Sequence, residues 1–314
     1  MNKIVVLGSL NMDLVINTPR IPVLGETIHG SGFATFPGGK GANQAVSAAK
    51  LGGDVNIIGC VGNDSYGTDL INSLTCNDVK VGNIKILEGV TTGIAVIVVR
   101  NGDNFIILDS GANFLLKPEQ MDQFKDVISN SDILMLQLEI PLDVVERAVE
   151  IAKYNGVKVL LNPAPACRLS DKLLSQIDII TPNESECEHI TGIPIRSLDD
   201  TAKAIKYLMN KSIKQIIVTL GSKGVIYNHG DEIIHRTVPS VKVVDTTAAG
   251  DSFSGALAVA LSNGKSIDNA IDFANIVGTI TVTRRGAQAS LPSLDEVKEY
   301  MKNNAKLFDN LSYA

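Results

Sequence analysis

The sequence predicts an α/β protein of three layers, with helices on both faces of a mostly parallel sheet. Short runs rich in Val, Ile and Leu alternate with segments of helical period along the chain. These runs are apolar throughout, as strands buried on both faces are. Residues 12–36 and 84–108 break the alternation with β-like pieces, which predict a small antiparallel β lid outside the main core.

The first predicted strand covers residues 3–7 (KIVVL), a short apolar run. Residues 41–51 predict a helix, because apolar side chains recur there at helical spacing and two glycines follow as a stop signal. Asn101 and Gly102 separate two apolar runs and predict a hairpin turn in the lid. Further strands are expected over residues 55–61, 133–138, 157–161, 177–180, 215–220 and 240–244, and further helices over residues 141–154 and 199–209.

The chain contains no long linker, low-complexity tract or fixed-period repeat. We therefore expect residues 1–314 to form a single domain with its lid. Division into two domains near residue 110 is the alternative, because the second β-like region ends there.

Composition and charge argue against several classes of protein. Asp and Glu number 34 against 28 Lys and Arg, and Trp is absent, so a nucleic-acid partner is not expected. The first residues do not form a signal peptide, and no apolar run approaches the ~18 residues of a membrane span, so we expect a cytoplasmic protein with no membrane partner. The four Cys and four His residues show no zinc-site spacing, which favours reduced thiols.

Residues 245–253 (DTTAAGDSF) contain the strongest candidate for chemistry. Small residues at Ala248, Ala249 and Gly250 allow a ligand close to the start of a helix, where free N–H groups and the helix dipole favour an anion. Asp251 places a carboxylate in the first helical turn beside that anion. It either accepts a proton from a hydroxyl that attacks phosphate or only complements the helix dipole.

Three further segments carry weaker signals. Residues 37–44 (PGGKGANQ) form a Gly-rich turn whose lysine and asparagine can face a polar ligand, although such helix starts are common. Asn11 and Asp13 follow the first strand and suit sugar hydroxyls, or form a plain Asx turn. Residues 219–224 (TLGSKG) lie between two strands and can contact phosphates or adenine, or form a simple hairpin.

Two familiar nucleotide fingerprints are absent. Residues 8–11 (GSLN) follow the first strand without Gly-x-Gly-x-x-Gly, which argues against a nicotinamide oxidoreductase. Residues 263–266 (NGKS) imitate the end of a Walker A motif, but Val259 stands where its earlier glycine is required.

Taken in order, these segments resemble the ribokinase-like (PfkB) carbohydrate kinase family, from residue 5 to about residue 291. Residues 38–44 resemble its first signature and residues 245–253 its second. Met12 occupies the variable middle of Asn-x-Asp and Ser252 stands where Thr is common, but neither has an assigned role. The likeness is strengthened by residues 162–166 (NPAPA), 181–184 (TPNE) and 283–288 (TRRGAQ).

The resemblance implies phosphorylation of the 5-hydroxyl of D-ribose by ATP with Mg²⁺, activated by a monovalent cation, usually K⁺. It makes Asp251 the catalytic base and the backbone of Ala248, Ala249 and Gly250 the anion hole. It also implies a homodimer built through the lid. The sugar contacts that it implies are Asn11, Asp13, Gly39, Lys40, Gly41, Asn43, Glu139 and Asp251. The nucleotide contacts are Asn183, Thr219, Leu220, Gly221, Ser222, Lys223, Gly224, Gly250 and Asn275. The cation site is formed, largely through backbone oxygens, by Asp245, Thr247, Thr281, Arg284, Gly286 and Ser290, while Glu186 is associated with Mg²⁺.

The alternatives are a kinase of 2-deoxyribose, another sugar or a nucleoside, and a sensor on the same fold that does not catalyse. Asn11 and Asp13 favour a sugar with adjacent hydroxyls, because polar groups that face a missing hydroxyl are left unpaired. The intact Asp251 argues against a sensor.

Overall fold

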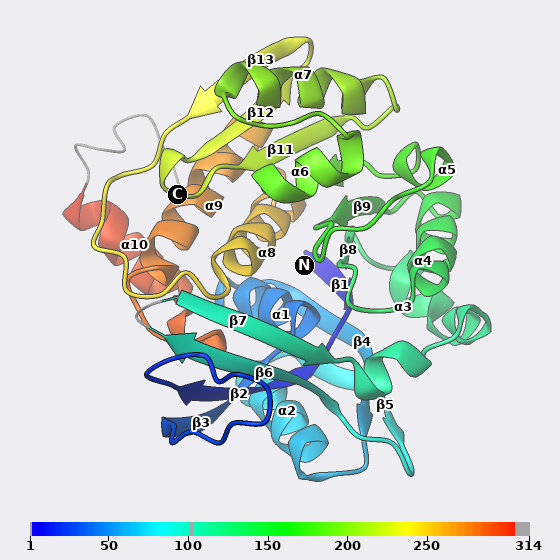
Figure 1. The fold of residues 1–314 in the computed structure, drawn as a ribbon. Helices are drawn as coiled ribbons and strands as arrows, with labels where there is room; N and C mark the ends of the chain where they lie inside the picture. The colour runs from blue at the N-terminus through cyan, green and yellow to red at the C-terminus, as the bar shows by residue number, and fades with distance from the viewer. Residues whose placement is uncertain (1, 101–102, 305–314) are drawn as a thin grey trace.

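The computed structural model describes residues 2–100 and 103–304, in which a nine-stranded sheet separates two layers of helices (Figure 1). The strand order is β13-β12-β11-β10-β9-β8-β1-β4-β5. Neighbours from β11 to β5 are parallel, whereas β12 is antiparallel to both β11 and β13. The strands are β1 (Lys3–Leu7), β4 (Asp54–Gly62), β5 (Lys80–Leu87), β8 (Ile133–Leu136), β9 (Lys158–Leu161), β10 (Ile179–Ile180), β11 (Gln215–Thr219), β12 (Val225–His229) and β13 (Glu232–Arg236).

The two helical layers are built on opposite faces of the strands. Successive side chains of a strand point to opposite faces, so Ile4 and Val6 join one hydrophobic cluster and Val5 and Leu7 the other. The first face carries α1 (Lys40–Lys50), α2 (Ser65–Cys76), α8 (Ala249–Ser262), α9 (Ile267–Thr281) and α10 (Leu294–Asn303). The second carries α3 (Lys125–Ser129), α4 (Leu142–Tyr154), α5 (Asp171–Leu174), α6 (Glu184–Thr191) and α7 (Leu198–Met209). Short 3₁₀ segments are η1 (Gly111–Leu115), η2 (Pro118–Phe124), η3 (Gly221–Lys223) and η4 (Gln288–Ser290). The predicted three-layer α/β class is confirmed.

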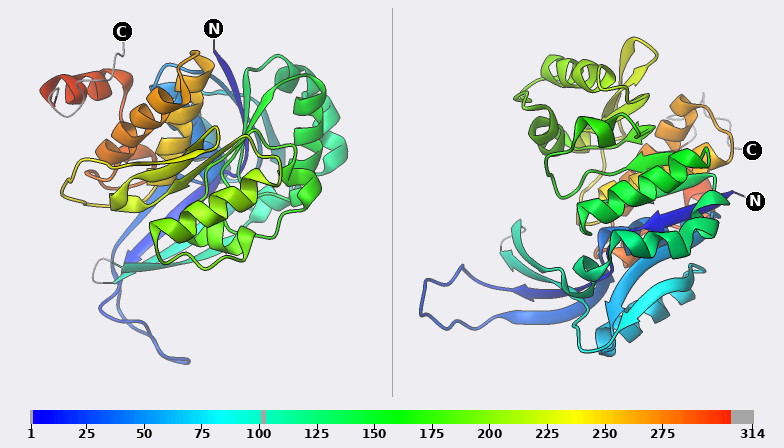
Figure 2. Two further views of the ribbon diagram at one scale, coloured as in Figure 1. Left: turned by 90° about the horizontal axis from the view of Figure 1, so that it is seen from above. Right: turned by 90° about the vertical axis from the view of Figure 1, so that its right-hand side faces the viewer.

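A second, four-stranded sheet forms the lid and projects from the main body (Figure 2). Its order is β3-β2-β6-β7. The two outer pairs are antiparallel, as expected, whereas the central pairing of β2 with β6 is parallel. Residues 84–87, expected in the lid, belong to β5 of the main sheet, and the predicted turn at residues 101–102 lies outside the described residues. The lid strands are β2 (Asn11–Asn17), β3 (Ser31–Gly38), β6 (Gly93–Arg100) and β7 (Asp103–Asp109).

Residues 240–244, which were expected to form a strand, are not a strand in the structure. The backbone N–H of Val244 donates to the carbonyl of Val282, after the end of α9, at 2.8 Å. Val243 and Val244 are 53% and 47% exposed. An apolar β-branched run forms a strand only where a neighbouring strand can pair with it, and this segment pairs with a helix end instead.

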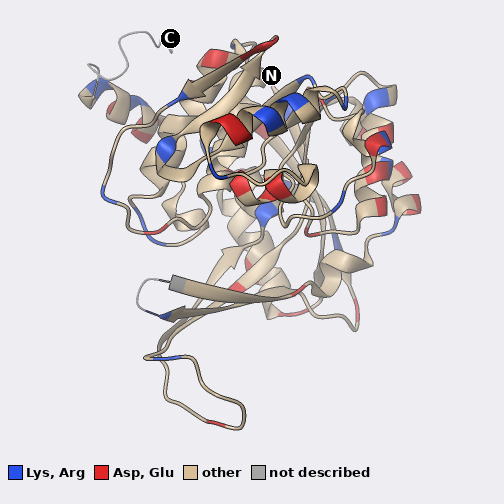
Figure 3. Ribbon diagram, turned by 45° about the horizontal axis from the view of Figure 1, so that its top comes forward, with Lys and Arg blue, Asp and Glu red and all other residues tan. Residues whose placement is uncertain are grey.

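The main sheet is continuous across residue 110, where the alternative of two domains would have divided the chain. Strand β1 pairs in parallel with β8, so segments from both sides of that point share one sheet. Acidic and basic side chains are mixed over the body, whereas the lid strands carry few of either (Figure 3). Over the described residues, no helix is both long enough and apolar enough to cross a membrane.

Candidate active site

The carboxyl ends of β1, β8, β9, β10 and β11 meet at one edge of the main sheet, because these neighbouring strands are parallel. In open α/β sheets this edge is where ligands bind. An open cleft lies there, and α8 begins beside it. Its lining residues are Lys40, Asn162, Ala164, Thr181, Asn183, Glu186, Thr219, Thr246, Ala248, Ala249, Gly250, Asp251 and Ser254.

Asp251, in the first turn of α8, is the acidic group in this cleft that hydrogen bonds to α1. Its side chain is only 6% exposed. The amide of Asn43 donates to Oδ2 at 3.0 Å, and that of Gln44 donates to Oδ1 at 3.1 Å. A carboxylate has about four lone-pair positions, so these two bonds leave acceptor capacity for a ligand. The site therefore contains a buried, oriented carboxylate that can still accept a hydrogen bond from a ligand.

Two glycines bring α1 close enough to supply those amides. Gly39 has φ +88°, and a Cβ there would lie 2.6 Å from the backbone nitrogen of Asn11. A Cβ on Gly41 would lie 2.5 Å from the carbonyl carbon of Gly8. The first turn of α1 thus packs directly on the backbone that follows β1, where Ala42 N donates to Ser9 O at 3.0 Å.

The start of α8 presents backbone N–H groups to the cleft. Ala248 caps the helix in the left-handed conformation, with φ 60° and ψ 10°, which is strained for a residue with a side chain. The N–H of Ala249 is already used, since it donates to the carbonyl of Thr246 at 3.2 Å. In the part of the chain that the structure describes, the N–H groups of Ala248 and Gly250 have no acceptor. Two of the three expected anion-hole amides are therefore available.

The predicted sugar-binding side chains gather where β1 passes into β2. Glu139 Oε2 accepts from Ser9 Oγ at 2.5 Å, from Asn11 Nδ2 at 3.3 Å and from the backbone N–H of Lys40 at 3.3 Å. Asn113 Nδ2 donates to Asn11 Oδ1 at 2.8 Å, and the side chain of Asn11 is buried. Asp13, also buried, lies on β2 within electrostatic reach of Glu139.

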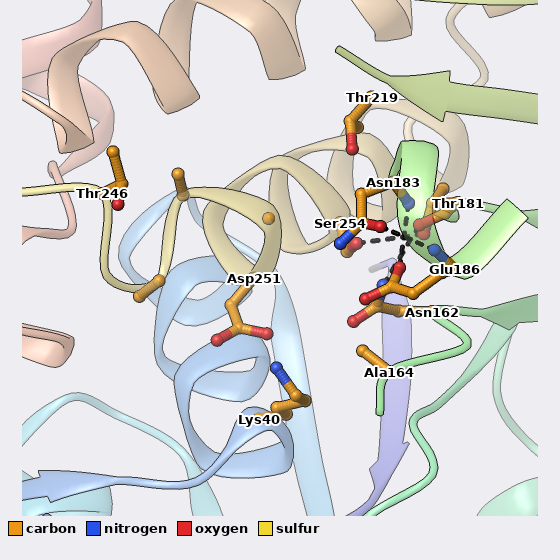
Figure 4. Close-up of a pocket in the computed structure, with 13 residues that line it drawn as sticks. Lys40, Asn162, Ala164, Thr181, Asn183, Glu186, Thr219, Thr246, Asp251 and Ser254 are labelled. Atoms are coloured by element: carbon orange, nitrogen blue, oxygen red, sulfur yellow. Dashed lines mark hydrogen bonds between the residues drawn. The ribbon is translucent and has the colours of Figure 1, made fainter. Parts of the chain in front are cut away.

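These carboxylates surround a single lysine of the cleft. The pKa of Asp13 is raised to about 7, mainly by burial and also by the charges of Glu139 and Asp251, while Lys40 opposes the shift. Burial alone would lower the pKa of Lys40, but Asp251, Glu139, Glu186 and Asp13 together raise it. Figure 4 shows the Lys40 side chain pointing toward the Asp251 carboxylate. Lys40 therefore stays charged and can face an anionic ligand.

The opposite wall is held by polar contacts at the ends of β9 and β10 (Figure 4). Asn183 and Glu186 cap α6 reciprocally, each side chain accepting from the other's backbone N–H at 2.8 Å. Burial raises the pKa of Glu186 and the charge of Asp251 adds to this, although the Asn183 N–H and Lys40 oppose the shift. The hydroxyls of Thr181 and Ser254 lie 3.3 Å apart.

The predicted nucleotide residues divide into two groups. Asn183 and Thr219 line the cleft, whereas residues 220–224 do not. Residues 220–224 form the loop that joins antiparallel β11 to β12, directly after Thr219. Asn275, on α9, is buried outside the cleft lining, and its Nδ2 has no partner among the described residues.

Asp245 joins two loops in or beside which the predicted cation residues lie, with Thr281 at the end of α9 and Ser290 in η4. Its Oδ1 accepts from the backbone N–H and the hydroxyl of Thr247 at 2.9 and 2.6 Å, and its Oδ2 accepts from Gly286 N–H at 3.0 Å. Burial would raise the pKa of Asp245, but these donors hold it below its usual range. The Arg284 guanidinium pairs with Glu296 at 2.8 Å, while Thr281 and Ser290 are buried. Across residues 2–100 and 103–304, no group of three or more His, Cys, Asp or Glu side chains is placed to hold a metal ion.

Sequence reasoning missed several amide side chains that support the site, among them Gln44, Asn162 and Asn113. Gln44 is the last residue of the Gly-rich segment 37–44, and Asn162 is the first residue of the NPAPA segment 162–166. Both therefore lie in motifs that the sequence shows. Asn113 stands in no such motif. It accepts from Leu10 N–H and donates to Leu10 O, contacts that only the folded chain brings together.

A family model described as the pfkB family carbohydrate kinases matches residues 1–294. The chain belongs to this family. It is 44% identical over 299 residues to a ribokinase of Haemophilus influenzae, covering 95% of this chain and 98% of that relative. It is 36% identical to a deoxyribokinase of Salmonella typhi, covering 96% of this chain and 99% of the relative. An Arabidopsis thaliana ribokinase complexed with ribose and ATP superposes with TM-score 0.91 at 33% identity, covering 96% and 99%. The family resemblance drawn from the motif order is confirmed.

The raised pKa of Asp13 predicts a specific pH dependence of the stability of this PfkB chain. In the folded chain Asp13 holds a proton up to about pH 7, whereas an unfolded Asp releases it near pH 4. The contribution of Asp13 to the free energy of unfolding therefore falls as pH rises from about 4 through 7. Asp13→Asn removes this contribution, so urea unfolding at pH 5 and pH 8 should show a smaller loss in the variant. If both proteins lost the same free energy of unfolding between pH 5 and pH 8, the raised pKa of Asp13 would be contradicted.

Proposed function

We propose that this chain transfers the γ-phosphoryl group of ATP to the 5-hydroxyl of D-ribose, giving D-ribose 5-phosphate and ADP. The observation that carries the proposal is the arrangement of Asp251, Lys40 and the available amides at the start of α8 around one cleft. The ribokinase relatives support ribose as the sugar. With ATP as phosphoryl donor, a cytoplasmic location fits this reaction.

Phosphoryl transfer depends on alignment and charge neutralisation more than on covalent chemistry. In the proposed mechanism, Asp251 takes the proton of the attacking hydroxyl through a lone pair that Asn43 and Gln44 leave unused. The N–H groups of Ala248 and Gly250 stabilise charge on the transferred phosphoryl group, as oxyanion-hole donors do. Lys40 supplies a positive charge on the same side of the cleft.

The sugar is held by the buried polar groups at the base of the lid. Asn43 Oδ1 is buried without a partner in the described residues, so it is suited to accept from a sugar hydroxyl. Asn11 and Glu139 share one hydrogen bond and retain further capacity, and Asp13 can donate or accept near neutral pH. Gly39 and Gly41 are proposed to contact the sugar through their backbone.

The nucleotide is proposed to lie along Asn183, Thr219 to Gly224 and Asn275, with its phosphates directed at α8. Glu186 fits Mg²⁺, because its Oε2 is held by the Asn183 N–H while its other oxygen has no partner in the described part of the chain. Mg²⁺ commonly takes one or two carboxylates together with substrate phosphates. When bound, it neutralises charge on the β- and γ-phosphates. Glu186, fixed by the cap of α6, would hold the ion.

A monovalent cation, K⁺, is proposed to lie between the two loops that Asp245 joins. Hard cations take oxygen ligands, and backbone carbonyls serve as well as side chains. Asp245 ties Thr247 to Gly286, which supports carbonyl groups of both loops facing one space. Thr281, Arg284 and Ser290 are proposed to contribute through their backbone.

A homodimer formed through the lid is the proposed assembly. Phe105, Ile106, Ile107 and Leu108 are consecutive on β7 and each is more than a third exposed, so both faces of this edge strand present apolar side chains. Exposed apolar patches of this kind mark ligand or protein contacts. One face is assigned to the sugar and the other to a second copy of the chain.

The choice of substrate predicts the outcome of a sugar panel with ATP and Mg²⁺, read as ADP release. Ribose should give a higher kcat/KM than 2-deoxyribose, because Asn11 and Asp13 would lack a partner at the missing hydroxyl. Rates should be higher in K⁺ buffer than in tetramethylammonium buffer. Faster turnover of 2-deoxyribose would contradict ribose as the preferred substrate. Equal rates in the two buffers would contradict activation by K⁺.

The proposed dimer predicts the effect of one charge on the lid. Ile107→Lys should convert the protein to a monomer in sedimentation velocity, because this side chain is 61% exposed and the lysine would bring a charge into the proposed interface. Tyr154→Lys, at an exposed position on α4, is the matched control and should keep the mass of the parent protein. A lid variant that retains the dimer mass would place the interface elsewhere.

A further inference from the structure

Gln44 joins four elements through one amide group. Its Nε2 donates to Asp251 Oδ1 on α8 at 3.1 Å and to Asn162 Oδ1, after β9, at 3.1 Å. Its Oε1 accepts from Gln137 Nε2, after β8, at 2.6 Å. Gln44 itself lies in the first turns of α1. Every hydrogen of its amide nitrogen is therefore used, and one of them is directed at the proposed base.

The orientation of this amide is determined by its partners. Only the nitrogen of Gln137 can donate to it, so the oxygen of Gln44 must face Gln137. A flipped Gln44 would present that oxygen to the carboxylate of Asp251 and to the oxygen of Asn162, two acceptors. Asn162 is in turn fixed, because its Nδ2 donates to the carbonyl of Thr181 at 3.1 Å.

Packing also confines this chain of amides. The side chains of Gln44 and Gln137 are fully buried. A Cβ on Gly8 would lie 1.9 Å from Gln137 Oε1, so the glycine at the end of β1 leaves the space that this side chain occupies. A group locked by such neighbours holds its partner within the narrow geometry that catalysis requires.

Gln44 differs from Asn43, the other amide that holds Asp251. Asn43 has an unpartnered oxygen and is assigned to the sugar, so a change there would alter binding as well as rate. Gln44 does not line the cleft and is fully buried. Any effect of Gln44 on the reaction must therefore pass through Asp251 or through the fold.

We propose that Gln44 is a positioning residue that orients the Asp251 carboxylate for proton transfer, and that Gln137 and Asn162 hold Gln44 in the orientation this requires. The inference rests on the proposed role of Asp251 as the base. It adds a set of buried amides, supplied by the ends of β8 and β9, to the machinery of the site.

The test compares Gln44→Met with Ser47→Ala, assayed with whichever sugar the parent enzyme phosphorylates fastest. Gln44→Met keeps the length of the side chain and removes the amide, so kcat should fall about 10- to 100-fold. Sugar affinity measured by calorimetry should change less than about threefold. Ser47 lies one turn further along α1 and donates to Ser252 O at 3.2 Å, without touching Asp251. Ser47→Ala removes this hydrogen bond, so the variant tests only the packing of α1 against α8 and should leave kcat unchanged.

A double-mutant cycle with Asp251→Ala separates positioning from packing. Gln44→Met should lower the residual rate of Asp251→Ala no further, because no carboxylate remains to be oriented. Equal fold losses in both backgrounds, or a wild-type kcat for Gln44→Met, would overturn the inference. If Gln44→Met does not fold, Gln137→Met frees the same amide and should lower kcat in the same direction. A wild-type rate for Asp251→Ala would instead reject the proposed base, so the two failures are distinct.

Discussion

A carboxylate buried at the start of a helix is the constraint on which the rest of this structure depends. A buried charge is costly unless hydrogen bonds replace the water that it loses, and Asp251 receives amide donors on both of its oxygens. Both donors come from α1, so α1 must lie against α8 and against the end of β1. Glycines at Gly39 and Gly41 permit that approach. The Gly-rich segment is therefore a packing device as much as a ligand-binding one.

The same site brings several buried charged side chains together, an arrangement that lowers the stability of the fold. Asp13, Glu139, Glu186 and Asp251 lie around Lys40, and the raised pKa values of Asp13 and Glu186 record the cost of burying acidic groups together. Local arrangements that oppose stability are expected where a protein carries out chemistry. The acceptors suit a polyhydroxylated substrate, while the lysine and the helix start suit phosphate.

Much of the fold could be predicted because buried parallel strands and amphipathic helices have local sequence patterns. The strand at residues 3–7 matches β1, and the helix at residues 41–51 differs from α1 by one residue at each end. Pairing partners are not local, which is why residues 240–244 were wrongly expected to form a strand and residues 84–87 were assigned to the lid. In the site, most of the residues that line the cleft lie in segments that the motifs marked. Asn113 and Gln137 could not be found, because their contacts join segments about 100 residues apart or depend on the exact packing of neighbouring strand ends.

The proposed mechanism requires Asp251 to receive the proton. The most direct test measures both kcat and sugar affinity of the Asp251→Ala variant. Removal of a general base typically costs about 10²–10⁴-fold in rate. The account predicts a loss of at least that size in kcat, with sugar binding by calorimetry largely retained, since Asn11, Asp13 and Glu139 remain. An unchanged kcat would contradict it, because the carboxylate at the start of α8 would then have no part in the reaction.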